Sequence, residues 1–466
     1  MTKRPRLVIA APASGSGKTT VTVGLMAAFR RRGLTVQGFK VGPDYIDPSF
    51  HAAITGRVSR NLDSWMMPTG VLREIFDRGS RSADLSIIEG VMGLYDGKDA
   101  TSDRASTAEV GRLLDAPVIL VLDVSKMANS AAAVVLGFQQ LDPRVPIVGV
   151  IANRVGSVGH YQLVKTAIEK ATGIPVLGYL RTTPEVMMPS RHLGLIPAIE
   201  RGELTPLFDR LAHQLAETVD LDALWQIAQR YGEWTPSPPV LFAGEPTPPR
   251  VTIAVAHDRA FNFYYPENLE LLEWYGARLI RFRPLDGEPV PPEADGLYLG
   301  GGFPEEFLPQ LSGQRAMMEG CRRAVSSGLP PLAECGGYRV VMDAIQPVAG
   351  IRYPRAGIIP ATAVMQKRLA ALGYREVTAV SDTVLLGQGE SARGHEFHYS
   401  TIQYGGDGWA WPYAFSVTSR GSVRLDGWAE GNLVASYMHL HWASRPFMVP
   451  RWIARCEAWR GASVNG

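Results

Sequence analysis

The chain has 466 residues, and its 47 Lys and Arg residues against 45 Asp and Glu residues give a formal net charge of +2. At roughly 100–200 residues per domain, this length excludes a single small binding module and predicts two or more domains. The balance of charge excludes overall electrostatic attraction to nucleic acid or to an acidic membrane, so we expect neither as a partner.

From Arg6 to about Leu180, short β-branched runs alternate with amphipathic helical patterns. The helical patterns include Thr19–Arg32, Ala105–Leu114 and Ala128–Gln140. Continuous apolar strands between such helices indicate a parallel sheet covered on both faces. This half is therefore predicted to be a doubly wound α/β domain. The predicted strands are Leu7–Ala11, Thr35–Val41, Leu85–Glu89, Pro117–Asp123, Pro146–Ala152 and Pro175–Leu180.

A glycine-rich loop follows the first predicted strand and precedes a helix. Its small residues let backbone N–H groups approach phosphate, Lys18 can neutralise β- and γ-phosphate oxygens, and Thr19 can offer its hydroxyl to Mg²⁺. The strict pattern asks for glycine where Pro12 stands, so the loop departs from it. We predict a site for ATP and Mg²⁺. The predicted nucleotide-binding residues are Ser14, Gly15, Ser16, Gly17, Lys18, Thr19 and Thr20.

Acidic loops follow the second and third predicted strands. Lys40–Asp47 reads KVGPDYID, and Glu89–Asp96 reads EGVMGLYD. Ligands of doubly wound sheets bind beyond the carboxyl ends of the strands, so both loops should face the nucleotide. We predict that Glu89 and Asp47, together with Thr19, bind Mg²⁺. A solvated turn is the open alternative for each acid taken alone.

A further helical stretch, about Leu204–Tyr231, leads into a segment rich in proline. Proline at that density cannot continue a helix or join the interior of a sheet, so the segment indicates a semi-rigid linker. We predict an ATP-binding domain at 1–231, a linker at 232–250 and a second α/β domain at 251–466. Strands of the second domain are expected at Val251–Asp258, Arg278–Phe282, Gly296–Leu299, Pro330–Ala333 and Leu433–Tyr437.

Cys335 lies at a tight turn between the strand at 330–333 and a helical run that starts near Tyr338. A helix N-terminus favours thiolate, and the N–H of Gly336 could donate to an oxyanion. The glycine loop at 299–305 could supply a second donor, which we assign to Gly301, with a plain glycine turn as the alternative. A partner base distant in sequence is expected, and the candidates are His439 and His441.

The other two cysteines, Cys321 and Cys456, lie in helical patterns and are expected to be core residues. Three widely spaced cysteines without a CxxC pair exclude a disulfide framework and disfavour a thiolate metal site. No apolar stretch approaches the ~20 residues needed to span a bilayer. We therefore predict a cytoplasmic protein with reduced thiols.

Two segments carry a family resemblance, FKVGPDYIDPSFHAAITGRVSRNLD at 39–63 and IEGVMGLYDG at 88–97. They resemble the cobyrinic acid a,c-diamide synthase family, whose N-terminal domain is similar to dethiobiotin synthetase, and the resemblance covers nearly the whole chain. It implies that ATP converts corrinoid carboxylates to acyl phosphates, which ammonia from glutamine then displaces. The implied substrates are the a and c acetate side chains of cobyrinic or hydrogenobyrinic acid. Residues expected near the activated carboxylate are Asp44, Tyr45, Asp47 and Asp96.

The second domain resembles a class I glutaminase, in which a cysteine thiolate attacks the side-chain amide of glutamine. Alignment of Tyr437–His439 with the Tyr–Leu–His of related amidotransferases implies that His439 is the base for Cys335. Such enzymes commonly place glutamate two residues later, where this chain has His441. A Cys–His dyad and an orienting acid from elsewhere both stay open. So does the role of Gly394–Ser400, for which a structural histidine cluster is one interpretation.

Other functions stay open at this point. Cobyric acid synthase and nickel-sirohydrochlorin a,c-diamide synthase share the architecture. A nucleotide-switched binding protein with a degenerate second domain is an alternative of another class, opposed by the intact Cys335 and His439. A dethiobiotin-synthetase-like carboxylase would have no use for the second domain. A homodimer is one open oligomeric state.

Overall fold

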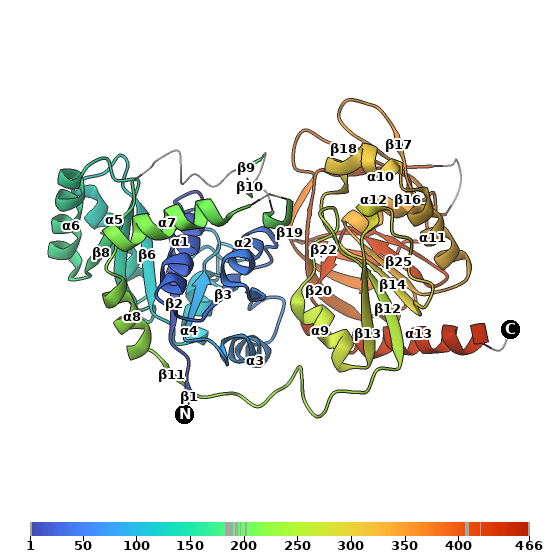
Figure 1. Ribbon diagram of the computed structural model, residues 1–466, viewed down its shortest axis with the longest axis horizontal. Coiled ribbons are helices and arrows are strands. Elements are labelled where there is room, and N and C mark those ends of the chain that lie inside the picture. Colours follow the sequence, from blue (N-terminus) through green and yellow to red (C-terminus); the bar gives the residue numbers. More distant parts are fainter. Residues whose placement is uncertain are drawn as a thin grey trace. The chain divides into compact units, whose positions relative to one another are not determined.

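The computed structural model of the chain describes residues 2–181, 190–191, 194–195, 197–200, 203–405, 410–419 and 421–464. The chain divides into two compact units, Met1–Val240 and Leu241–Gly466, and each has a parallel sheet of its own (Figure 1). Within the described residues, no helix is both long and apolar enough to cross a membrane.

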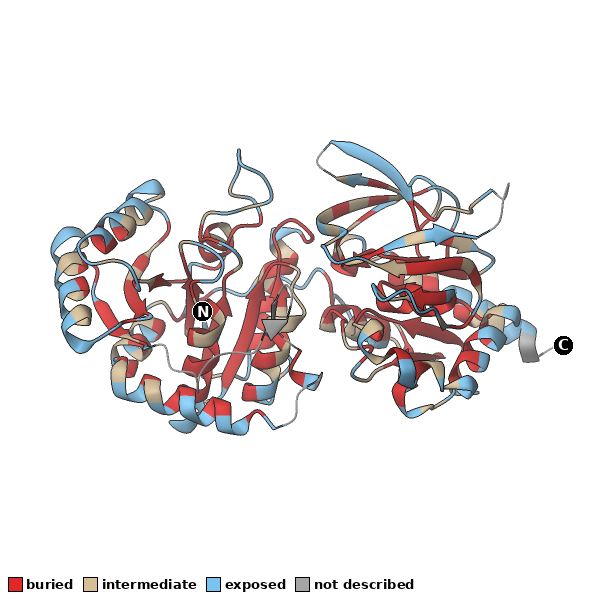
Figure 2. Ribbon diagram, turned by 90° about the horizontal axis from the view of Figure 1, so that it is seen from above, coloured by how far each residue is buried: buried red, intermediate tan, exposed pale blue. Residues whose placement is uncertain are grey.

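A seven-stranded parallel sheet forms the centre of the first unit, in the order β4-β3-β5-β2-β6-β7-β8. Its strands are buried between helices whose outer faces are exposed (Figure 2). The α/β class predicted for this half is confirmed, and β4 at the sheet edge is an addition. The strands are β1 (Thr2–Lys3), β2 (Arg6–Ala10), β3 (Val36–Val41), β4 (Arg60–Leu62), β5 (Leu85–Glu89), β6 (Val118–Asp123), β7 (Ile147–Asn153), β8 (Val176–Tyr179), β9 (Ser190–Arg191), β10 (Gly194–Leu195) and β11 (Glu233–Trp234).

Helices of the first unit pack closely enough to need glycine at one crossing. A Cβ on Gly24 of α1 would lie 2.2 Å from Cδ1 of Leu215 on α7. The single stretch predicted at 204–231 is two helices, because Val219 is extended and Asp220 caps α8 by accepting the N–H of Ala223 at 2.9 Å. The helices are α1 (Lys18–Arg31), α2 (Ile46–Thr55), α3 (Thr69–Ser80), α4 (Thr107–Leu113), α5 (Ser130–Leu141), α6 (Val158–Thr172), α7 (Thr205–Thr218) and α8 (Leu221–Arg230).

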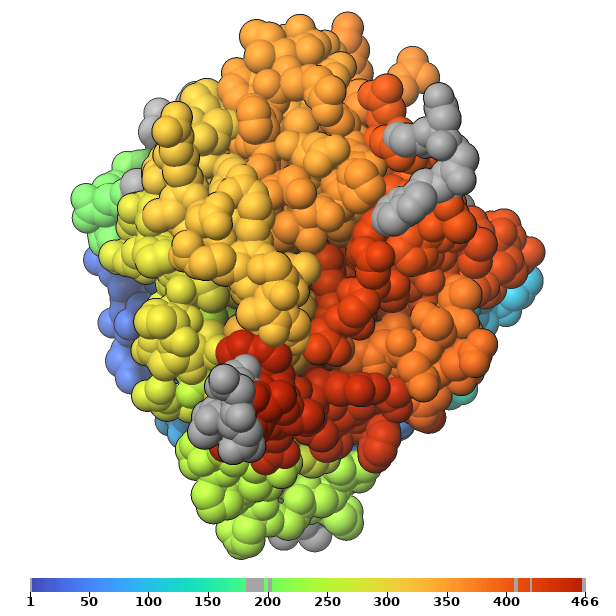
Figure 3. Space-filling model, turned by 90° about the vertical axis from the view of Figure 1, so that its right-hand side faces the viewer, coloured from blue at the N-terminus to red at the C-terminus, as the bar shows by residue number. Residues whose placement is uncertain are grey.

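The second unit is built on a six-stranded sheet in the order β13-β12-β14-β15-β25-β24, parallel except for the β24–β25 pair. Its C-terminal helix α13 reaches the surface on the face shown in Figure 3, and the side chains of Trp452, Ile453 and Cys456 of this helix are buried. The strands of this sheet are β12 (Val251–Ala256), β13 (Ala277–Phe282), β14 (Gly296–Leu299), β15 (Pro331–Glu334), β24 (Trp428–Glu430) and β25 (Leu433–Ser436). The helices are α9 (Pro266–Trp274), α10 (Leu308–Ser312), α11 (Arg315–Ser326), α12 (Gly336–Val341) and α13 (Met448–Val464).

Two further sheets, mainly antiparallel, complete the second unit and were not predicted. One has the order β17-β16-β18-β21 and the other β23-β22-β19-β20-β26. Several of their pairs, such as β18 with β21 and β20 with β26, join strands that are not neighbours in sequence, which no local pattern reveals. The strands of these two sheets are β16 (Met342–Gln346), β17 (Tyr353–Pro354), β18 (Ile359–Met365), β19 (Ala371–Ala379), β20 (Ser391–His398), β21 (Ser400–Tyr404), β22 (Phe415–Ser419), β23 (Ser422–Asp426) and β26 (His439–Leu440).

Candidate active sites

The glycine-rich loop between β2 and α1 makes backbone turns that require glycine. Gly15 and Gly17 have φ values of 77° and 94°, in the left-handed region. A Cβ on Gly17 would lie 2.1 Å from Nδ2 of Asn153, which donates to the carbonyl of Ser16 at 2.8 Å. Asn153, at the end of β7, therefore supports the loop, a role that was not predicted from the sequence. Of the other loop residues, Ser14 is exposed and Thr20 is half-buried.

Lys18 and Thr19 begin α1 and reach toward the loop that follows β5. Nζ of Lys18 donates to the carbonyls of Met92 at 2.5 Å and Ala13 at 3.2 Å. Burial, and next the charge of Lys40, lower the pKa of Lys18 to about 8. Oγ1 of Thr19 donates to Oε1 of Glu89 at 2.6 Å. The lysine and hydroxyl of the loop thus lie together at the carboxyl ends of β2 and β5.

Lys40, the fifth residue of β3, joins two of the acidic residues singled out in the sequence. Its Nζ lies 2.7 Å from Oδ2 of Asp47 and 3.2 Å from Oε1 of Glu89. Nε2 of His51 lies 2.7 Å from Oε2 of Glu89, and its Nδ1 lies 3.1 Å from Oγ of Ser59. Neither Lys40 nor His51 was predicted from the sequence to have a role. A lysine inside the buried strand VQGFKV was the available signal, because buried lysines are almost always paired.

Lys40, Asp47, Glu89 and His51 form one cluster, in which the pKa values of the two carboxylates shift in opposite directions. Burial acts to raise the pKa of Glu89, but the charge of Lys40 and the hydrogen bond with His51 hold it well below its usual range. Burial, then the charges of Asp44 and Glu89, raise the pKa of Asp47 well above its usual value. Carboxylate oxygens are ligands that Mg²⁺ and other hard divalent cations prefer.

Mg²⁺ fits the donors present at this cluster, which are a threonine hydroxyl and carboxylates. No group of three His, Cys, Asp or Glu side chains that could hold a metal occurs in the described ranges. Mg²⁺ usually takes one or two carboxylates and completes its shell with water and substrate phosphates. Thr19, Glu89 and Asp47 therefore suit an ion that is shared with a bound nucleotide.

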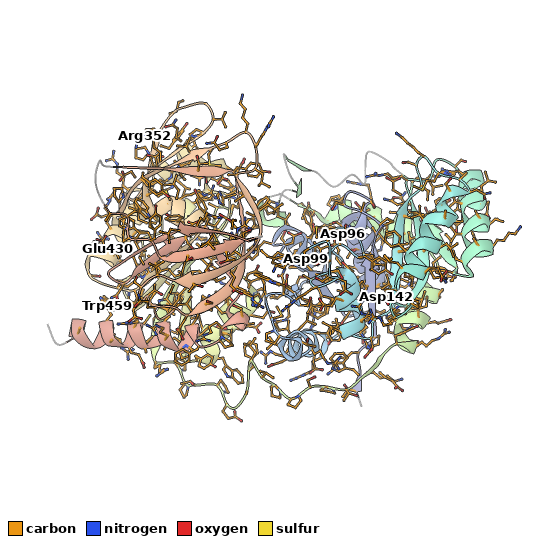
Figure 4. The ribbon with its side chains drawn as sticks, turned by 180° about the vertical axis from the view of Figure 1, so that it is seen from behind. Asp96, Asp99, Asp142, Arg352, Glu430 and Trp459 are labelled. Atoms are coloured by element: carbon orange, nitrogen blue, oxygen red, sulfur yellow. The ribbon has the colours of Figure 1, made fainter. Side chains whose placement is uncertain are left out.

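The other acidic-loop residues stabilise local turns. Oδ1 of Asp44 accepts the N–H of Ile46 at 2.7 Å at the start of α2, where Tyr45 is half-buried. Asp96 is exposed in the loop after β5 (Figure 4), and its Oδ2 accepts the N–H of Gly93 at 2.8 Å. Asp44 and Tyr45 adjoin Asp47, and the charge of Asp96 acts on Lys18.

Cys335 occupies a strained turn between β15 and α12. Its φ of 48° and ψ of −94° cost about 1–3 kcal/mol in a residue other than glycine. Its N–H donates to the carbonyl of Ser436 at 2.8 Å, and a Cβ on Gly337 would lie 2.1 Å from the carbonyl oxygen of Leu299. The turn is therefore pressed against β14 and β25 at the carboxyl edge of the six-stranded sheet.

The glycine loop after β14 lies against both the Cys335 turn and His439. A Cβ on Gly301 would lie 2.3 Å from Cε1 of His439, and a Cβ on Gly336 would lie 3.1 Å from the amide nitrogen of Gly302. The N–H of Gly301 donates to the carbonyl of Phe263 at 3.3 Å. This bond corrects the predicted oxyanion role of Gly301, because its only amide donor is engaged within the fold. Gly302 is the loop residue that adjoins Gly336.

Burial keeps the thiol and the imidazole neutral at neutral pH. It raises the pKa of Cys335 to about 11, although the charge of Arg339 opposes the rise. It also lowers the pKa of His439 well below its usual value. The helix-stabilised thiolate expected from the sequence is not found, because α12 has only six residues and Cys335 is buried. The pair can act as an acid and a base only if the proton passes from sulfur to imidazole during attack.

Arg339 ties the nucleophile turn to the glycine loop and was missed in the sequence. Its guanidinium contacts Oε2 of Glu305 at 2.7 Å, and Nη2 donates to the carbonyl of Gly302 at 3.0 Å. Nε donates to the carbonyl of Cys335 at 3.4 Å. One buried side chain therefore holds both loops.

Two further histidines of the second unit, His441 and His398, contact different carboxylates. Nε2 of His441 lies 3.9 Å from Oε2 of Glu267. His398 lies 2.8 Å from Oε1 of Glu396 and stacks on Tyr437, with ring centroids 3.6 Å apart. These contacts agree with a structural cluster for part of the segment 394–400. Cys321 and Cys456 are buried in α11 and α13, as expected of core residues.

Two protein-family models match the chain. The CobQ/CobB/MinD/ParA nucleotide binding domain matches residues 7–196, and the CobB/CobQ-like glutamine amidotransferase domain matches residues 252–447. Among curated proteins, the chain is 50% identical over 453 residues to the cobyrinate a,c-diamide synthase of Priestia megaterium, with 97% of each chain covered. It is 44% identical to that of Picrophilus torridus, with 97% of this chain and 98% of the relative covered. It is 42% identical to the hydrogenobyrinate a,c-diamide synthase of Streptomyces coelicolor, with the same coverage.

Proposed function

Because the chain belongs to the cobyrinate a,c-diamide synthase family, we propose that it amidates the a and c acetate carboxylates of cobyrinic acid with ammonia from glutamine. The nucleotide-binding domain would activate each carboxylate, and the amidotransferase domain would release ammonia. The observation that carries the proposal is the presence in one chain of a phosphate loop beside Glu89 and of a buried Cys335 whose turn adjoins the same glycine loop as His439. Such an enzyme is a ligase of cobalamin biosynthesis.

Activation begins with a poor electrophile, since a carboxylate resists attack by ammonia. A carboxylate oxygen attacks the γ-phosphorus of ATP, ADP leaves, and an acyl phosphate forms. Lys18 would neutralise the phosphate oxygens, with loop amides from Ser14 to Thr20 around them. Thr19, Glu89 and Asp47 would hold Mg²⁺, which supplies charge neutralisation to the phosphates when bound. Asp44 and Tyr45 lie next to Asp47 and are proposed to face the corrinoid carboxylate.

Ammonia comes from the second unit. Cys335 attacks the side-chain amide carbon of glutamine as His439 takes its proton, and the tetrahedral oxyanion meets the N–H of Gly336. Collapse releases ammonia, with His439 returning the proton to it, and water hydrolyses the thioester to glutamate. Ammonia then displaces phosphate from the acyl phosphate and gives the amide. A dyad without an adjacent glutamate is consistent with His441 standing at that position.

Hydrogenobyrinic acid is a second candidate substrate, favoured by the 42% identity to the Streptomyces coelicolor enzyme of that name. Both macrocycles present the same acetate groups and differ in bound cobalt. A homodimer and a cytoplasmic location stay predictions, which light scattering and cell fractionation would test.

Mass spectrometry tests the proposed reaction directly. The purified chain is incubated with MgATP, glutamine and either cobyrinic or hydrogenobyrinic acid. Two acid-to-amide mass shifts on one macrocycle, together with ADP and glutamate, are the expected products. A macrocycle returned unchanged in both reactions, with glutamine intact, would contradict the proposal.

A further inference from the structure

Strand β20 contains part of the segment 394–400, to which the proposed reaction assigns no role. β20 pairs antiparallel with β26 so that His395 lies directly opposite His439, and Gly394 lies opposite Leu440. A Cβ on Gly394 would lie 2.0 Å from the carbonyl oxygen of His439. Only glycine at 394 allows this approach, so the strand is built to bring His395 against the proposed base.

The two imidazole rings are stacked. The centroids of His395 and His439 lie 4.8 Å apart, with planes inclined by 15°. His395 is 5% exposed and His439 is 1% exposed. A parallel stack of this kind leaves the ring edges available for hydrogen bonds while it fixes the plane of each ring.

A second contact fixes the ring of His395. The hydroxyl of Tyr265 lies 2.8 Å from Nδ1 of His395. The Tyr265 ring in turn packs on His441, with centroids 4.4 Å apart, and Glu267 faces His441 at 3.9 Å. The carboxylate of Glu267 therefore faces His441. An aromatic row, Tyr265 with His395, abuts the proposed base instead.

We propose that His395 is a positioning residue for His439, which holds the plane of its ring and stabilises the imidazolium formed when His439 takes the proton of Cys335. This inference rests on the proposed glutaminase reaction. It assigns to His395 the orienting role that class I glutaminases commonly give to a glutamate two residues after the histidine. A neutral aromatic ring attracts a cation placed over its face, and the attraction grows when both are shielded from water. The stack therefore favours the charged form that exists only during the reaction.

The charges around the stack are compatible with a neutral His395. Burial lowers the pKa of His395 to about 3, with Arg375 and His441 acting in the same direction and Glu396 opposing them. After burial, the positive charges of His395, His398 and Arg339 act to lower the pKa of His439, and His395 exerts this repulsion only when it is itself protonated. At neutral pH His395 carries no proton charge, so it presents a π face to His439 and no repulsion.

Three variants separate the stack from the hydrogen bond. His395→Leu removes the ring, His395→Phe keeps a flat ring without nitrogen atoms, and Tyr265→Phe removes only the hydroxyl. Glutamate release is measured at varied glutamine with MgATP and the corrinoid acid, to obtain kcat and KM. His213→Gln is the control, because His213 is an exposed histidine of the first unit.

We expect kcat to fall roughly 100-fold in His395→Leu and about 10-fold in His395→Phe, with KM for glutamine unchanged. Tyr265→Phe should lose less, and His213→Gln should match the wild type. Partial rescue by phenylalanine is the sign of stacking, which a merely space-filling residue would not produce. If His395→Leu does not fold, as judged by circular dichroism, the phenylalanine variant and Tyr265→Phe still decide.

Full kcat in both His395 variants would overturn the inference, as would equal losses in leucine and phenylalanine. A rise in KM with kcat preserved would also overturn it, because it would place His395 in glutamine binding. A wild-type protein that releases no glutamate would instead contradict the proposed function, which keeps the two failures apart.

Discussion

Both proposed sites lie at the carboxyl ends of parallel strands, but they differ in whether their buried functional groups are ionised. In the first unit, Lys40 stands among buried carboxylates, and Glu89 is held ionised by its partners. In the second unit, burial keeps Cys335 and His439 neutral, and the charge of Arg339 does not offset the effect of burial on the pKa of Cys335. Burial with partners preserves charge, and burial without them removes it. The first arrangement suits phosphate and a metal ion, and the second suits proton transfer.

The largest expected effect comes from the first unit. Lys18→Ala should reduce amide formation by about 1,000-fold or more with either glutamine or ammonia, because the charge that faces the phosphates is lost. Amide formation is measured by mass spectrometry with each nitrogen source. Lys126→Ala, at an exposed lysine, is the control. Amidation by Lys18→Ala at the wild-type rate would remove Lys18 from the nucleotide site.

The next effect should be confined to one nitrogen source. His439→Asn should lower glutamine-dependent amidation about 100-fold or more, since the general base is lost. Ammonia-dependent amidation measures the first unit by itself in the same preparation. An equal fall with ammonia would show that the division of labour between the two sites is wrong.

The ionisation of Cys335 tests, through its pH dependence, whether the second site is neutral while the first is charged. Because burial raises the pKa of Cys335 to about 11, the thiolate fraction should rise with pH. Alkylation by iodoacetamide should therefore accelerate about 10-fold per pH unit from pH 7 to 10. The Cys335→Ala protein gives the background from Cys321 and Cys456. A rate that is already level at pH 7 would indicate a preformed thiolate–imidazolium pair and remove the contrast.

The smallest effect concerns a partner of Glu89. His51→Leu should leave one oxygen of a buried carboxylate without its hydrogen bond and lower the free energy of unfolding by about 1.5–3 kcal/mol. His51→Gln, which can still donate, should recover part of the loss. Urea denaturation of both variants measures the difference. Equal stability of His51→Leu and wild type would mean that His51 does not support the cluster.

Local sequence patterns predicted more of the first unit than of the second. Apolar runs predicted its parallel strands, and the loop with Lys18 and Thr19 lies where a strand-loop-helix pattern places it. Lys40 and His51 lie in a segment that the sequence singled out, but they received no role, because a pattern of acids does not say which cation pairs with them. Cys335 was found from its turn. His395 could not be given a role, because only the pairing of β20 with β26 brings it to His439.

The effect of burial was also invisible in the sequence. A cysteine before a helix suggested a thiolate, but the short α12 and the buried thiol reverse that expectation. Gly301 looked like an amide donor until its N–H was seen to bond with Phe263. Both corrections depend on what surrounds a group in three dimensions, which local residue order does not give.

The nitrogen-source dependence of Cys335→Ala tests whether the second unit only releases ammonia while the first unit activates the carboxylate. Amide formation on the corrinoid acid is followed by mass spectrometry with MgATP and either glutamine or ammonium at a pH that supplies free ammonia. We expect glutamine-dependent amidation to be lost while ammonia-dependent amidation continues at the wild-type rate. Loss of both activities in a folded protein would contradict this expectation.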